Sequence, residues 1–272
     1  MRETVTVDQL YSNYDVEHDE FAAALDESLD PRDRDLLFDL VADLDPAAGS
    51  LAVDVGCRRA HYAIELARRF GLRVHGVDPM RNHIDDARQA IADSDVAGLV
   101  GVELGVGESL SPADDSVSLV WCRDVLVHVA DLDAVFAEFR RVLRPDGHAV
   151  VFQMMATDWL EPQEAQRLWA GLAVVPENTD QRRFESAIRA AGLSIETNIN
   201  LSSEWREASE EDYSRPTSVE LLRLARLLRG REKFVARFGQ TEYDITVSHC
   251  LWGVYQMIGK LSPRVYVLGR QS

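Results

Sequence analysis

The stretch 51–78 most constrains what this chain can fold into. Residues 51–55 form an apolar run that meets Gly56, and a helical pattern of apolar residues follows. Residues 72–77 are a second apolar run, which ends on Asp78. This order predicts a buried strand, a tight turn, a helix and a second strand. Such a unit can bind a nucleoside, because glycine lets the backbone approach a ligand, the helix offers free amides and the carboxylate accepts from ribose hydroxyls.

The residues after Gly56 argue against a dinucleotide site. A pyrophosphate requires the three glycines of G-x-G-x-x-G over the start of the helix. Here Cys57, Arg58, Arg59 and Ala60 follow the first glycine. The sequence therefore disfavours an NAD-dependent dehydrogenase, although this stretch alone leaves open a parallel α/β unit that binds nothing at the turn.

Composition limits the partners of the chain. Its 272 residues include 46 acids and 29 bases, a net charge of −17, which argues against binding to nucleic acid. The three cysteines are scattered, so we expect a reducing cytoplasmic compartment and no disulfide framework. The histidines show no ligand-like clustering, so no metal is predicted. No apolar run reaches the length of a membrane span and the first residues do not resemble a signal peptide, so no membrane partner is expected.

Strand and helix patterns continue to alternate after Asp78. Helical patterns cover 81–94 and 132–143, and apolar runs at 99–104, 117–122 and 149–152 are typical of buried strands. Regular alternation of this kind predicts a parallel, doubly wound sheet with helices on both faces.

Four segments, in this order and at these spacings, resemble the motifs of class I S-adenosylmethionine-dependent methyltransferases. Asp54, Gly56 and Cys57 match the start of the family's D-x-G-C-G-x-G, although Arg58 and Ala60 replace the later glycines. The other segments are 114–120, similar to P-D-x-S-F-D-L-V; 126–129, similar to L-H-H-V; and 136–147, similar to L-x-E-x-x-R-V-L-K-P-G-G.

The resemblance implies an α/β fold with a doubly wound, mostly parallel, seven-stranded Rossmann-like sheet and an antiparallel edge strand. The last two strands would be 193–199 and 265–268, and about sixty mostly helical residues stand where the family has a tight hairpin. We therefore expect an N-terminal helical cap segment at 1–48, a core at 49–201 plus 263–272, and a helical cap insertion at 202–262.

The resemblance also implies which residues hold S-adenosylmethionine. Asp78 would accept from the ribose hydroxyls, or cap the helix that follows. The backbone of Gly56 and Cys57 would line the methionine moiety. Asp54 would brace this loop or reach the amino group. Arg58 would pair with the methionine carboxylate, and the alternative is that it crowds the site.

Further cofactor contacts are expected around these residues. Val106 stands where the family places an acid for adenine, so adenine recognition would rest on backbone amides near Gly107 and Glu108. The remaining candidates are Pro79 and Met80 after the second strand, and the backbone of Arg123 at the end of the fourth.

The acceptor side is less constrained by motifs. His128 stands where the family places a histidine that faces the substrate, and it would act as a general base; the alternative is packing between its two valine neighbours. We expect the cap, with an N-terminal segment and the 157–170 helix, to enclose a small, partly apolar acceptor. The aromatic candidates for acceptor binding are Tyr11, Tyr14, Trp159, Trp205 and Tyr243, each of which could instead hold the cap to the core.

The sequence therefore predicts methyl transfer to oxygen, nitrogen or carbon of a small molecule. Two alternatives remain: a methyltransferase-like protein that catalyses a non-methyl reaction such as cyclisation or rearrangement, and one that binds without catalysis. The long cap helices also leave open a homodimer.

Overall fold

The computed structural model describes residues 4–14 and 19–271 of the chain, which form two units, Met1–Pro31 and Arg32–Ser272. The first unit contains the short helices α1 (Val7–Tyr14) and α2 (Asp19–Asp26). Tyr11 is exposed on α1, and the side chain of Tyr14 lies outside the described part of the chain. All other elements belong to the second unit.

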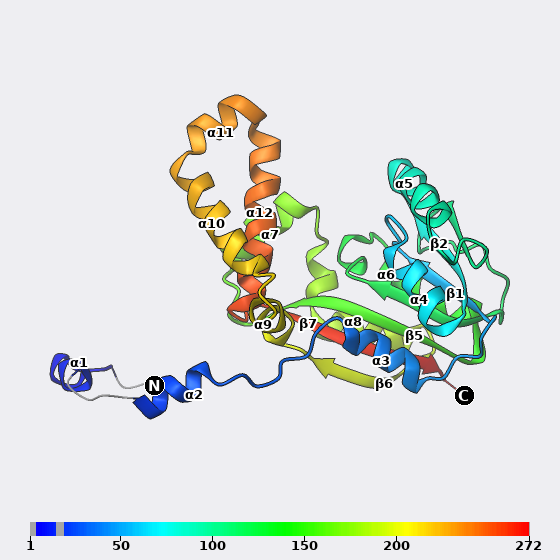
Figure 1. Ribbon diagram of the computed structural model, residues 1–272, viewed down its shortest axis with the longest axis horizontal. Helices are drawn as coiled ribbons and strands as arrows, with labels where there is room; N and C mark the ends of the chain where they lie inside the picture. The colour runs from blue at the N-terminus through cyan, green and yellow to red at the C-terminus, as the bar shows by residue number, and fades with distance from the viewer. Residues whose placement is uncertain (1–3, 15–18, 272) are drawn as a thin grey trace. The chain divides into compact units, whose positions relative to one another are not determined.

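A seven-stranded sheet organises the second unit (Figure 1). Its strands lie in the order β3-β2-β1-β4-β5-β7-β6. The first five strands in this order, β3, β2, β1, β4 and β5, pair in parallel. β7 is antiparallel to both β5 and β6. The predicted antiparallel pair at the sheet edge is therefore confirmed. The strands are β1 (Leu51–Val55), β2 (Arg73–Asp78), β3 (Val100–Leu104), β4 (Val117–Arg123), β5 (Leu143–Ala156), β6 (Leu193–Asn200) and β7 (Leu261–Arg270).

Helices cover both faces of the sheet, as the alternation predicts. The helices between and before the strands are α3 (Asp35–Asp43), α4 (His61–Phe70), α5 (Arg81–Ala92), α6 (Leu132–Val142), α7 (Pro162–Leu172) and α8 (Gln181–Ala190), with 3₁₀ turns η1 (Leu126–His128) and η2 (Pro176–Thr179). Of the helices in the described ranges, none combines the length and apolar composition that crossing a bilayer requires.

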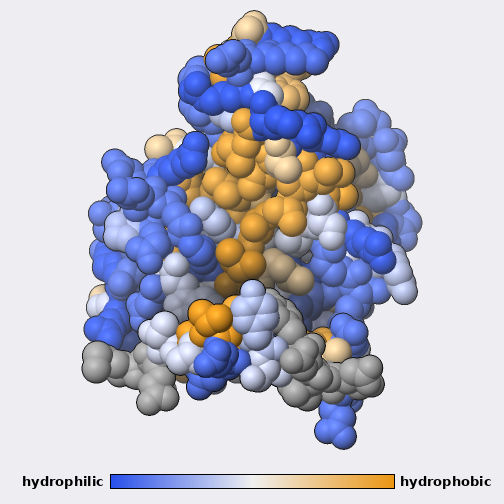
Figure 2. Space-filling view, turned by 90° about the vertical axis from the view of Figure 1, so that its left-hand side faces the viewer, coloured by the Kyte–Doolittle hydropathy of each residue, from blue (hydrophilic) through white to orange (hydrophobic). Residues whose placement is uncertain are grey.

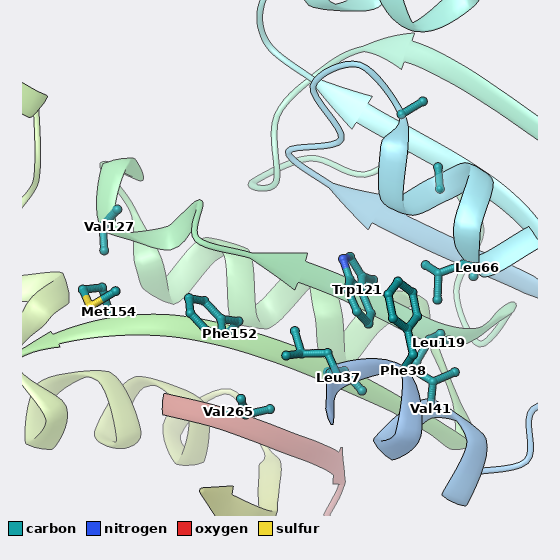
Figure 3. Packing of buried hydrophobic residues seen from close by; sticks show 14 of the residues in the cluster. Leu37, Phe38, Val41, Leu66, Leu119, Trp121, Val127, Phe152, Met154 and Val265 are labelled. Atoms are coloured by element: carbon teal, nitrogen blue, oxygen red, sulfur yellow. The ribbon is translucent and has the colours of Figure 1, made fainter. Parts of the chain in front are cut away.

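Side chains alternate between two hydrophobic clusters because successive strand residues point to opposite faces. One cluster joins α3 and α4 to the sheet: Phe38 of α3 stacks on Trp121 of β4 with ring centroids 5.3 Å apart, and Leu66 of α4 lies nearby (Figure 3). The other joins α6 and α8, where Phe136 contacts Phe184 edge-on at 5.3 Å. This rigid layer fixes the loops at the carboxyl ends of the strands.

Two strands are longer than the sequence pattern predicts. The segment Pro145 to Gly147, expected to stop the helix before a strand at 149, instead lies inside β5 as an irregular stretch opposite β4. A Cβ on Gly147 would lie 2.7 Å from the carbonyl oxygen of Val117, so the close strand approach requires glycine there. β7 begins at Leu261 rather than 265, because it pairs with β5 as far as Ala156.

The insertion between β6 and β7 is helical, and its last three helices stand away from the sheet (Figure 1). The insertion begins with α9 (Glu204–Glu211). The three helices that stand away from the sheet are α10 (Pro216–Arg229), α11 (Arg231–Phe238) and α12 (Gln240–Met257). Whether this insertion is a domain of its own stays a prediction.

Apolar side chains recur at helical spacing along α10, at Leu221, Leu224, Ala225 and Leu228. Of these only Leu224 is buried, together with Leu227, whereas Leu221 and Leu228 are 55% and 52% exposed. α10 packs on one side only, chiefly against α12, so the rest of its stripe has no partner among the described residues of this unit.

Candidate functional site

Two adjoining cavities lie at the carboxyl ends of β1, β2 and β4. The β2 cavity, of about 460 Å³, is bounded by Asp78 at the end of β2 and by residues of α7 and α12. The β1 cavity, of about 400 Å³, is bounded by Asp54 and the start of α4. Both are lined by Gly56, Arg58, Asp124 and Val125, so one extended ligand can occupy the two together.

The loop between β1 and α4 keeps the backbone of a glycine-rich turn without the glycines. Gly56 has a φ of 75°, and a Cβ there would lie 2.2 Å from a methyl carbon of Val125. Arg58 and Ala60 have φ values of 47° and 59°, in the left-handed region that favours glycine. Each such residue costs roughly 1 kcal/mol. The substitutions noted in the sequence therefore change side chains at this turn but not its path.

Cys57 supports the same turn from inside the domain. Its amide and that of Gly56 both donate to the carbonyl oxygen of Val77, at 3.1 and 2.8 Å. Its side chain is buried against Gly76, where a Cβ would lie 2.9 Å from the sulfur. Burial raises the pKa of this thiol far above its usual range, so it stays protonated and unreactive.

Asp78 ties this turn to the start of α5. Its Oδ2 accepts from the amide of Arg58 at 3.0 Å, and its Oδ1 accepts from the amide of Met80 at 2.9 Å and lies 3.0 Å from His83 Nδ1. A carboxylate offers about four acceptor sites. Oδ2 therefore keeps one acceptor site for a ligand hydroxyl in the β2 cavity. Asp78 also contributes to capping α5, the alternative role expected from the sequence, because its Oδ1 accepts from the amide of Met80.

Asp54 is a buried carboxylate with an unpartnered oxygen. The side chain is 2% exposed, and its Oδ2 has no hydrogen-bond partner in the described part of the chain. Burial raises the pKa of Asp54 to about 7, the backbone amide of Ala63 opposes the shift, and the charge of Asp78 adds to it. A cationic group in the β1 cavity would satisfy this oxygen and stabilise its charged form.

Arg123 presents its side chain as well as its backbone, which the sequence did not predict. Its guanidinium lies against three rings, with the carbon Cζ 4.9 Å from the centroid of Tyr62, 5.2 Å from Phe152 and 5.5 Å from Trp205. Its Nε is buried and has no hydrogen-bond partner among the described residues. Arg123 and Asp54 thus bring opposite charges, each incompletely satisfied, to one cavity.

Asp124 is a further residue of the candidate site. It has a φ of 56°, lines both cavities, and its Oδ1 is buried without a partner in the described ranges. Burial raises the pKa of this carboxyl, while the charges of Arg123 and His128 lower it. Its position directly after β4 is the only sequence signal for this role.

His128 lines the β2 cavity on η1 with a fixed ring orientation. Its Nδ1 lies 3.2 Å from the carbonyl oxygen of Ala173, which can only accept, so the hydrogen is on Nδ1 and Nε2 is the basic atom. His83 and His249 line the same cavity, although the sequence showed no clustering of histidines. In the described residues no group of three or more His, Cys, Asp or Glu could hold a metal ion.

The remaining predicted residues are dispersed. Pro79 and Met80 line the β2 cavity, and Trp205 contacts the guanidinium of Arg123. Gly107 and Glu108 line neither cavity. Trp159 is 69% exposed.

Tyr243 is buried between helices of the insertion, and its hydroxyl donates to the carbonyl oxygen of Leu227 at 3.4 Å. Trp252, nine residues later on α12, lines the β2 cavity instead, together with Leu172. The helical pattern could not show which ring of α12 faces the site.

The chain is similar to known methyltransferases. The family model described as "Methyltransferase domain" matches residues 53–151, which begin inside β1 and include the turn after it, β2 and β4. Methyltransferase GfsG of Streptomyces halstedii is 33% identical over 118 residues, which are 43% of this chain and 42% of that protein. The chain therefore aligns with less than half the length of that relative.

Solved structures share the fold. A geranyl diphosphate methyltransferase in complex with SAM has a TM-score of 0.61 at 18% identity and covers 92% of this chain and 94% of its own. The [4+2]-cyclase SpnF has a TM-score of 0.66 at 20% identity, with coverage of 87% and 81%. At such identities the likeness establishes the architecture alone.

Proposed function

Because the chain belongs to the class I S-adenosylmethionine-dependent methyltransferases, we propose that it transfers the methyl group of S-adenosylmethionine to a small molecule held in the β2 cavity. One observation carries this proposal: Asp54 and Arg123 line one cavity beside the glycine turn, and each has a buried polar side-chain atom that is unpartnered in the described residues. This is the arrangement that a zwitterionic amino acid tail would complete.

The residues fit the cofactor from end to end. Asp54 Oδ2 would accept from the α-ammonium group, and Arg123 would donate to the α-carboxylate, with Arg58 at the mouth of the cavity. Asp78 would accept from a ribose hydroxyl with its free acceptor site. Pro79 and the half-exposed Met80 would contact the base in the β2 cavity.

The chain's part in the reaction is orientation and proton transfer. Bound S-adenosylmethionine supplies a methyl group that is already activated by a sulfonium. Asp124 and Val125, which border both cavities, would hold the acceptor against the cofactor and exclude water. His128 Nε2 would take the proton of an acceptor hydroxyl or amine while Nδ1 keeps its bond to Ala173, and the charge of Asp124 would stabilise the resulting imidazolium.

The lining of the β2 cavity suits a small and partly apolar acceptor. Leu172 and Trp252 contribute apolar surface, and His128 and His249 contribute polar atoms. The volume of this cavity, about 460 Å³, lies in the range typical of small-molecule sites.

Calorimetric titration with S-adenosylmethionine and S-adenosylhomocysteine tests the cofactor. We expect saturable binding, and we expect Asp78→Ala to weaken it by tenfold or more, because a ribose hydroxyl loses a charged acceptor. An absence of heat with the folded wild-type chain would overturn the proposal.

Transfer itself is followed with cofactor labelled at the methyl group. Methyl transfer requires that label enters a small-molecule product in step with formation of S-adenosylhomocysteine. A product that forms without label, while the cofactor stays intact, would assign the chain to non-methyl chemistry, which the fold also supports in a solved cyclase.

A further inference from the structure

The outer surface of α10 and α11 differs in charge from the rest of the molecule. Between residues 215 and 238, seven basic side chains are exposed: Arg215, Arg223, Arg226, Arg229, Arg231, Lys233 and Arg237. The acids of this stretch are Glu232, which is exposed, and Glu220, which pairs with Arg206 at 3.1 Å. In a chain of net charge −17, this surface, which we call the α10–α11 surface, is a local cationic region.

The same surface exposes apolar side chains. Val219, Leu221, Leu222, Leu228 and Phe238 are 41–55% exposed. Leu221, Ala225 and Leu228 follow one another at helical spacing, so they form a row beside the arginines. Figure 2 shows apolar residues gathered on this side of the molecule, at the level of α10, with hydrophilic residues above them.

The position of this surface separates it from the acidic body. α11 lies at the end of the insertion farthest from the sheet (Figure 1). The 18 residues of α12 span about 27 Å, about three times the Debye length of about 8 Å at physiological ionic strength. The acidic residues of the sheet domain therefore do little to oppose an anion at α11, whereas Glu210 of α9 contacts Thr217 and Ser218 in the first turn of α10.

We propose that the α10–α11 surface docks on anionic phospholipid, with the exposed leucines entering the interface and the arginines contacting phosphate groups. Neither cavity of the functional site draws a lining residue from α10 or α11, so this surface is separate from that site. A second copy of the chain is disfavoured because a two-fold contact would face cations with cations. Peripheral docking of this kind needs no spanning segment.

Vesicle sedimentation with the full chain tests the proposal. We expect binding to vesicles that contain phosphatidylglycerol and little binding to phosphatidylcholine alone. The triple variant Arg223→Gln, Arg226→Gln, Arg229→Gln should lower affinity on the order of 10²-fold, because each cation near an anionic surface contributes about fivefold. The double variant Leu221→Ser, Leu228→Ser should also lower it, and added salt should weaken binding by the wild-type chain.

A matched control separates local from overall charge. Arg88→Gln, Arg144→Gln, Arg182→Gln removes three exposed cations from α5, β5 and α8 and should leave vesicle binding unchanged. Equal binding by both triple variants, or equal binding to both lipids, would overturn the proposal.

Folding and self-association are checked with the same variants. Thermal unfolding and cofactor titration should match the wild type, since no substituted residue lines the site. Concentration-dependent dimerisation that the Leu→Ser variant abolishes, without vesicle binding by the wild type, would assign the surface to a second copy instead.

Discussion

Burial governs the behaviour of Asp54. An aspartate carboxyl ordinarily titrates near 3.8, and burial raises the pKa of Asp54 to about 7. The unfolded chain releases this proton at lower pH than the folded chain does. Stability is therefore lost as pH rises from about 4 to 7, and ionisation of the folded state costs roughly 4 kcal/mol above that range. In the proposed complex, a ligand cation would stabilise the ionised Asp54 carboxylate, which the unliganded fold disfavours.

Asp54→Asn removes that titration. Because the variant cannot ionise, its free energy of unfolding relative to the wild type should improve between about pH 4 and 7 and level off above that. Urea unfolding at several pH values without cofactor measures this. A constant difference between the two chains across the range would show that Asp54 does not titrate there.

The same residue predicts a pH dependence of cofactor binding. A ligand ammonium group requires the ionised carboxylate, so affinity for S-adenosylmethionine should fall as pH drops below about 7, by at most tenfold per unit. In Asp54→Asn binding should be weak and should lack this dependence. Calorimetry between pH 5.5 and 8 makes the comparison.

Two arginines can be separated as partners of the cofactor carboxylate. Arg123→Gln should weaken binding by tenfold or more, since its guanidinium is held by three rings at the cavity. Arg58→Gly should instead raise stability by about 0.5–1 kcal/mol, because it relieves a φ of 47°, with little loss of affinity. If Arg58→Gly loses more affinity than Arg123→Gln, the assignment of the two residues is reversed.

At the scale of elements, the path of the turn between β1 and α4 depends on Gly56. Gly56 and Gly49 have similar φ values of 75° and 78°, but a Cβ on Gly56 would meet Val125 at 2.2 Å, whereas one on Gly49 would have open space. Substitution of these two glycines therefore distinguishes the effect of backbone strain, which both share, from the effect of a steric clash, which only Gly56 has.

Gly56→Ala should destabilise the chain by several kcal/mol or displace the η1 loop, and cofactor binding should be lost. Gly49→Ala should cost only about 1 kcal/mol and leave binding intact. Thermal unfolding with titration of both variants checks this. Equal effects would mean that strain alone, and not the contact with Val125, sets the requirement for glycine.

Elements were predictable where the pattern is local. The strand, turn and helix at 51–70 and the acid at the end of β2 follow from apolar periodicity and one glycine, and the structure confirms them. The start of β5 was not, because Pro145 and Gly147 are local stop signals that pairing with β4 overrides. The rings that hold Arg123 come from α4, β5 and α9, and no local pattern relates those three segments.

At the scale of the molecule, both halves of the cofactor should contribute to stability. Ligand at about 100 times its dissociation constant stabilises the folded state by about 2.7 kcal/mol, which in a chain of this size raises the melting temperature by several degrees. S-adenosylhomocysteine should produce this shift. Adenosine at the same concentration should produce much less, because it leaves Asp54 and Arg123 unpartnered. Equal shifts in melting temperature with the two ligands would show that the amino acid tail does not bind in the β1 cavity.

The whole fold was predictable to the order of its layers, whereas the partners of its surfaces were not. Alternating patterns and four motifs predict the sheet and its final pair of strands, which the structure confirms. The exposure of most apolar side chains of α10 could not be foreseen, because a stripe in the sequence does not say whether a neighbour covers it.

The place of β7 between β5 and β6 affects how the chain assembles. β6 is finished about sixty residues before β7, yet it has no strand to join until β7 has paired with β5. On the ribosome, β6 must therefore wait while the whole helical insertion is synthesised. During that interval β5 presents an open edge, where a truncated or stalled chain would be most prone to aggregate.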